Sequence, residues 1–182
     1  MRTPSPALGL AAAGLLLAAG GVLHPRVDTA VDFEAGLAGM VESSTWVAAH
    51  ALTMAGYVVL AVSLAALARG SAWAWAAAAG AAVAAVESVP HVLAADVHTV
   101  LQAFATPAVG LSIAALAVVS HGRIVASFAV VGGVAYALAG PAIAISENPA
   151  FSPLFVGSAG IAVWCVVAGT RMARTHEPAV AR

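Results

Sequence analysis

Histidines are the residues of this chain whose positions suggest chemistry, because imidazole is the commonest metal ligand among side chains. His50 and His91 fall inside long apolar runs, and His24 and His98 lie at the edges of such runs. An ionisable group within a membrane span costs about 2.5–3.5 kcal/mol on insertion scales, so it faces the bundle interior. We therefore expect these histidines to gather in a polar pocket at one depth.

Helical spacing supports this grouping. Trp46 and His50 are four residues apart, and so are Glu87 and His91. Residues four apart lie on the same face of a helix, one turn above each other. Each pair therefore forms part of one polar stripe on its own helix.

The first functional hypothesis is a metal site. His91 and His98 are seven residues apart, about 10 Å along a continuous helix, so they cannot share an ion unless the helix breaks. The predicted ligands of a divalent transition metal are therefore His50, His91 and Glu87, with His24 as a fourth. Three such ligands and a water are typical of a hydrolytic zinc site.

A haem b site is the other version of this hypothesis, with His50 and His91 as axial ligands. The protein would then carry electrons, exchanging them with a quinone or a redox partner protein, and the potential would depend on ligation and burial. Glu87 would be a hydrogen-bond or proton partner of the ligands.

Secondary candidates lie around the same pocket. His98 and Asp96 are at its predicted rim, and Trp46 is expected to anchor its helix at the membrane interface. Glu147 follows the fifth apolar run and could take part in a proton relay with Glu87.

Other classes of function stay open, and so does whether the chain is an enzyme. The polar residues could serve only as contacts between helices, in a structural protein without a cofactor. A proton-coupled permease for a small solute could use Glu87, His91 and Glu147 as a relay. A lipid-phase enzyme could use Glu87 or Asp96 as an acid in an apolar cavity.

Composition identifies the elements that must position these residues. Hydrophobic residues make up 62% of the 182 residues and charged residues 8%, against about 45–50% and 25% in soluble domains. The chain is therefore expected to be an all-α integral membrane protein, one domain over 1–182, in contact with the lipid bilayer. No basic cluster indicates nucleic acid as a partner, and composition says nothing about oligomeric state.

The apolar runs, each near the length of a spanning helix, are 7–23, 46–68, 72–93, 101–120, 124–145 and 152–170.

Arginines suggest how these spans are oriented. Arg69, Arg123 and Arg171 follow the second, fourth and sixth runs, while seven of the eight acidic residues fall on the opposite side. The positive-inside rule then places both termini in the cytoplasm and the histidines at the outer side of a plasma membrane. Alternatively, the first run is a cleaved signal peptide, which would leave five spans.

The longest connection, 24–45, carries apolar residues at near-helical spacing with acids on other faces. This pattern predicts a short amphipathic helix on the outer interface between the first two spans.

Overall fold

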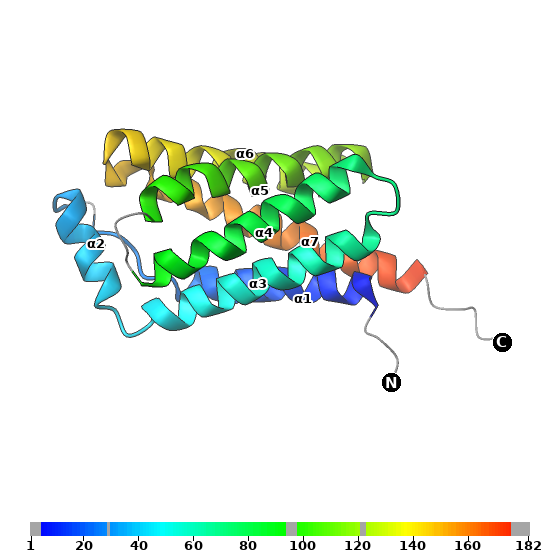
Figure 1. Cartoon of the computed structure of the whole chain (residues 1–182), viewed down its shortest axis with the longest axis horizontal. Coiled ribbons are helices and arrows are strands. Elements are labelled where there is room, and N and C mark those ends of the chain that lie inside the picture. The colour runs from blue at the N-terminus through cyan, green and yellow to red at the C-terminus, as the bar shows by residue number, and fades with distance from the viewer. Residues whose placement is uncertain (1–4, 29, 94–97, 121–122, 176–182) are drawn as a thin grey trace.

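The computed structural model describes residues 5–28, 30–93, 98–120 and 123–175, and these form helices joined by short connections (Figure 1). In chain order the helices are α1 (Pro6–Leu23), α2 (Phe33–Val41), α3 (Trp46–Leu67), α4 (Ala72–Val92), α5 (His98–Ser120), α6 (Arg123–Ser146), the 3-10 helix η1 (Pro149–Val156) and α7 (Gly157–Thr175).

Six helical segments are long and apolar enough to cross a membrane, which confirms the predicted number of spans. They are α1, α3, α4, α5, α6 and the last segment, Ala150–Thr175, which joins most of η1 to α7. Asn148 and Pro149 start the 3-10 turn, because the Asn148 side chain accepts a hydrogen bond from the amide of Ala150.

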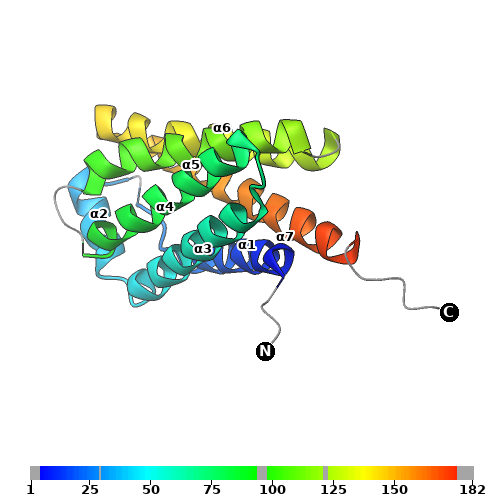
Figure 2. The ribbon, with the colours of Figure 1, turned by 45° about the vertical axis from the view of Figure 1, so that its right-hand side comes forward.

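The spans form a closed ring. Each packs on its neighbours in the sequence, and α7 packs back on α1. Figures 1 and 2 show that successive spans run in alternating directions, so α1 begins and α7 ends at the same end of the bundle. Short connections favour this antiparallel order. The ring interior is filled by fully buried side chains, including Leu60, Ile113, Ile161 and Trp164.

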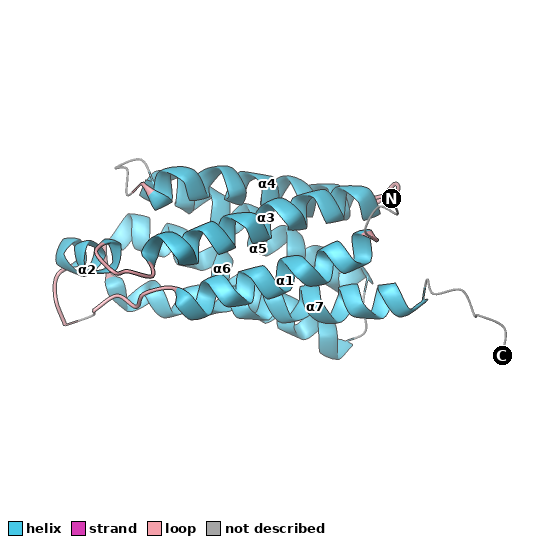
Figure 3. Ribbon diagram, turned by 90° about the horizontal axis from the view of Figure 1, so that it is seen from below, coloured by secondary structure: helices cyan, strands magenta, loops and turns pink. Residues whose placement is uncertain are grey.

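The connection between α1 and α3 contains the expected amphipathic helix, α2. Its first turn is capped by Asp32, whose carboxylate accepts a hydrogen bond of 2.8 Å from the amide of Ala35. Figures 1 and 3 show α2 at the end of the bundle where α3 begins and α4 ends. It therefore lies at the same end as the predicted polar pocket.

Glycines allow the closest contacts between spans. A Cβ atom added at Gly133 of α6 would overlap the carbonyl oxygen of Gly110 on α5, and one at Gly157 of α7 would overlap that of Gly132 on α6. Small residues at such crossings let backbones approach in membrane bundles. Gly21, near the end of α1, has open space where its Cβ would be.

This difference gives a test of the packing. Gly133→Ala should lower the free energy of unfolding by about 1–3 kcal/mol, because the added methyl group forces two backbones apart. Gly21→Ala should leave it unchanged or raise it slightly, because alanine favours a helix over glycine. Equilibrium unfolding in detergent measures both variants, and an equal response would contradict the close contact of α5 and α6.

Candidate metal centre

Three imidazoles meet at the end of the bundle near α2. His24, His50 and His91 each place a ring nitrogen within 4.8 Å of the others. His24 is the residue that ends α1, His50 lies in the second turn of α3, and His91 lies in the last turn of α4. These helix ends meet because α3 packs between α1 and α4 and runs in the direction opposite to both.

The rings are in direct contact. The centroid of His50 lies 4.8 Å from that of His24 and 4.6 Å from that of His91. His50 is 5% exposed, and the other two side chains are partly buried. The cluster is therefore a compact group, largely withdrawn from solvent.

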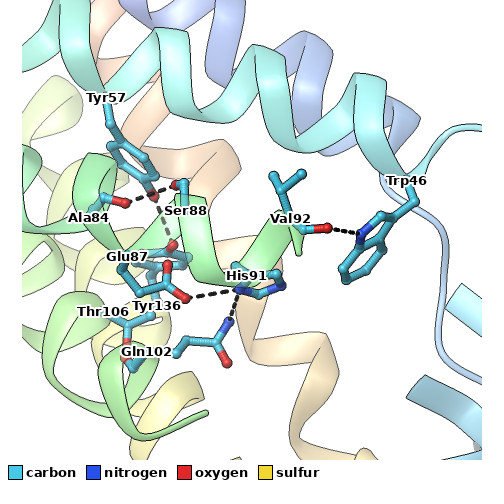
Figure 4. A network of polar contacts seen from close by, with 10 residues as sticks. All are labelled: Trp46, Tyr57, Ala84, Glu87, Ser88, His91, Val92, Gln102, Thr106 and Tyr136. Atoms are coloured by element: carbon cyan, nitrogen blue, oxygen red, sulfur yellow. Dashed lines mark hydrogen bonds and ion pairs between the residues drawn. The ribbon is translucent and has the colours of Figure 1, made fainter. Parts of the chain in front are cut away.

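Trp46 forms one wall of the cluster. Its ring centroid lies 4.0 Å from that of His50, 5.5 Å from that of His91 and 5.9 Å from that of His24. The indole N–H donates a hydrogen bond of 3.1 Å to the carbonyl oxygen of Val92, linking α3 to α4 (Figure 4). Trp46 is 2% exposed, so it packs inside the bundle at the start of α3.

Each imidazole has its Nδ1 atom next to an acceptor. Nδ1 of His24 lies 2.7 Å from the carbonyl oxygen of Pro25, and Nδ1 of His50 lies 2.8 Å from that of Trp46. Nδ1 of His91 lies 3.0 Å from Oε1 of Glu87. These contacts favour the tautomer with hydrogen on Nδ1, in which Nε2 carries the lone pair that can bind a metal.

Glu87 was predicted either as a metal ligand or as a hydrogen-bond partner of the ligands. In the structure its carboxylate pairs with Nδ1 of His91 (Figure 4), and the group of three potential ligands consists of the histidines. Glu87 and His91 are four residues apart, so their side chains are neighbours on one face of α4, one helical turn apart. The side-chain nitrogen of Gln102, on α5, lies 3.5 Å from the same Nδ1 atom, so Glu87 makes the closer contact.

Glu147, a further candidate, is not one of the three clustered residues. Glu147 is exposed at the end of α6, where its φ of 49° turns the chain out of the helix. His98 begins α5, but its side chain lies outside the described part of the structure, as does Asp96. The sequence analysis did not single out Tyr136 of α6, whose hydroxyl accepts a hydrogen bond from Tyr57 of α3. A lone tyrosine in an apolar span resembles an ordinary core residue.

Burial lowers the pKa of His24 below its ordinary value of 6.5, against the opposing effect of its hydrogen bond to the Pro25 carbonyl. Repulsion from a protonated His91 lowers it further. The neutral form, which is the form that binds metals, is thereby favoured near neutral pH.

These observations define a class of protein. The chain is a multi-pass helical membrane protein with three histidines placed closely enough to hold a metal ion. No protein-family model, no curated protein and no solved structure matches it.

The lowered pKa of His24 predicts how stability changes with pH. The unfolded chain binds a proton at His24 more readily than the folded protein does, so folding stability should fall as pH drops below about 6.5. His24→Gln should reduce this decline by removing the titrating group. Unfolding of the metal-free protein between pH 7.5 and about 5 measures the difference. Identical pH profiles of the two proteins would contradict a burial effect on His24.

Proposed function

We propose that this protein binds a transition-metal ion through Nε2 of His24, His50 and His91. The observation that carries the proposal is the convergence of three imidazoles within 4.8 Å, each with an acceptor at Nδ1. Metal-binding histidines usually donate their other ring hydrogen to a carbonyl or carboxylate, which fixes the ring orientation. Two carbonyls and one carboxylate are in these positions here.

The spacing needs only a small adjustment to hold an ion. Nitrogens around a tetrahedral metal with bonds of 2.0–2.1 Å lie about 3.3 Å apart. The widest pair, at up to 4.8 Å, would therefore close by about 1.5 Å. The rings of His24 and His91, which are partly buried, would have to rotate to supply this movement.

Ligand type limits the choice of metal. Imidazole suits zinc, copper, nickel and iron, whereas magnesium and calcium prefer oxygen ligands. Three protein ligands leave one position for water or a substrate, as in catalytic rather than structural zinc sites. Such an ion can lower the pKa of bound water or polarise a carbonyl, and copper or iron would in addition allow electron transfer.

A single ion fits this geometry better than haem. The rings of His50 and His91, the predicted axial pair, touch each other with centroids 4.6 Å apart. A porphyrin between them would have to part these rings and displace the indole of Trp46, which lies 4.0 Å from His50. The proposed cofactor is therefore a transition-metal ion, and a quinone or a protein redox partner enters only if that ion is redox-active.

The arginine distribution supports a location at the outer side of a plasma membrane, with both termini in the cytoplasm. In this orientation the centre exchanges ions and solutes with the compartment outside the cell. The bilayer surrounds the spans, and α2 lies at the membrane surface beside the centre.

Metal titration of purified, metal-free protein tests the proposal. We expect one zinc ion per chain, and a loss of affinity of at least about 100-fold in His50→Ala or His91→Ala, since each removes a direct ligand. His24→Ala should have a similar effect. His121→Ala is the matched control, because this histidine comes two residues before Arg123 and the arginine distribution assigns it to the opposite side of the membrane, and affinity should be unchanged.

Elemental analysis of protein from metal-supplied cells, with a visible spectrum before and after dithionite, separates the two cofactors. We expect a metal in about one-to-one ratio and no sharp haem bands. Stoichiometric haem would contradict the single-ion proposal, and protein that takes up neither metal nor haem would contradict both.

A further inference from the structure

Two tyrosines form a hydrogen bond across the interior of the ring, close to the metal centre. The hydroxyl of Tyr57, on α3, donates to the hydroxyl of Tyr136, on α6, at 2.7 Å (Figure 4). Tyr57 is 3% exposed. The ring of Tyr136 also contacts Phe155 of η1 edge-on, with centroids 5.8 Å apart. The pair therefore links opposite sides of the ring.

Because Tyr57 is the donor in this hydrogen bond, the hydroxyl hydrogen of Tyr136 is not used in it. A phenol has one O–H to donate and also lone pairs that can accept. Tyr57 uses its hydrogen on Tyr136, and this bond with Tyr57 is the one that the structure shows for the Tyr136 hydroxyl. Buried hydroxyl groups in an apolar interior almost always donate as well as accept, so an acceptor for the Tyr136 hydrogen is expected within a small movement of this side chain.

Glu87 is the acceptor that lies nearby. Its carboxylate is within electrostatic reach of both phenols, and Figure 4 shows it between the tyrosine pair and His91. One of its oxygens, Oε1, contacts His91. A carboxylate has room for several hydrogen bonds, so accepting from both His91 and Tyr136 is chemically reasonable.

We infer that the Tyr136 hydroxyl donates to the Glu87 carboxylate and so acts as a positioning residue for His91. The result is a chain of hydrogen bonds, called the string below, which runs from Tyr57 through Tyr136 to Glu87. Glu87 also accepts from Nδ1 of His91. Its effect on metal affinity rests on the proposed function, whereas its effect on the orientation of His91 does not. Through this string α6, which supplies no ligand, helps to orient the centre made by α1, α3 and α4.

The two tyrosines give a matched pair of variants. Tyr136→Phe removes the donor to Glu87, and also leaves Tyr57 without its acceptor. Tyr57→Phe removes a hydroxyl from the same pair but leaves Tyr136 able to donate. A role limited to packing or to the tyrosine–tyrosine bond predicts equal effects, whereas the string predicts a large effect only for Tyr136→Phe.

The test combines nitrogen-15 NMR of the imidazoles in the metal-free protein with a zinc titration of the same samples. In Tyr136→Phe we expect the Nδ1–H resonance of His91 to move and zinc affinity to fall about 10–100-fold, as for other groups that orient a ligand. In Tyr57→Phe the resonance should stay and affinity should change less than about twofold. Adding Tyr136→Phe to Glu87→Leu should cause no further loss, because the carboxylate that it orients is already gone.

Equal effects of the two phenylalanine variants would overturn the inference, and so would an unmoved His91 resonance in Tyr136→Phe. If that resonance moves as expected but the unaltered protein binds no zinc, the string holds and the proposed metal site fails. If zinc binds through the three histidines and Tyr136→Phe changes neither readout, the metal site holds and the string fails.

Discussion

A polar side chain inside an apolar bundle must find hydrogen-bond partners, and this constraint shapes the whole end of the molecule near α2. The imidazoles of His24, His50 and His91 meet it at Nδ1, through two backbone carbonyls and one carboxylate. Because each Nδ1 is engaged in this way, the Nε2 atoms are the nitrogens that would bind the proposed metal ion. Trp46 packs beside the rings, and its indole N–H donates a hydrogen bond to the Val92 carbonyl of α4. The same interactions that make the histidines compatible with the bundle therefore prepare them for an ion.

Much of the fold follows from local sequence properties. Six apolar runs of spanning length predicted six spans, and the structure has them at nearly the same residues. The apolar spacing within 24–45 indicated α2. The ring, however, is a property of contacts between distant segments. Nothing in the local pattern of α1 or α7 shows that these two helices pack together.

The candidate site was predictable in part, for similar reasons. Helical phase placed His50 and His91 toward the interior, and the structure brings them together. The role of His24 depended on how the chain leaves α1, which helical periodicity cannot describe. For Glu87 the sequence left two roles open, metal ligand and hydrogen-bond partner of the ligands, and the structure pairs it with His91, one helical turn away. Tyr136 gave no signal, since its hydrogen-bond partner, Tyr57, is 79 residues away on a different span.

The central claim is that these three histidines bind one metal ion together. X-ray absorption spectroscopy at the zinc edge, on protein loaded with one equivalent of zinc in detergent, tests it most directly. The account predicts three imidazole nitrogens at about 2.0–2.1 Å with the multiple-scattering pattern of histidine rings, plus one oxygen ligand from water. A first shell of oxygens alone, or a spectrum unchanged when His24, His50 and His91 are all replaced by alanine, would contradict it.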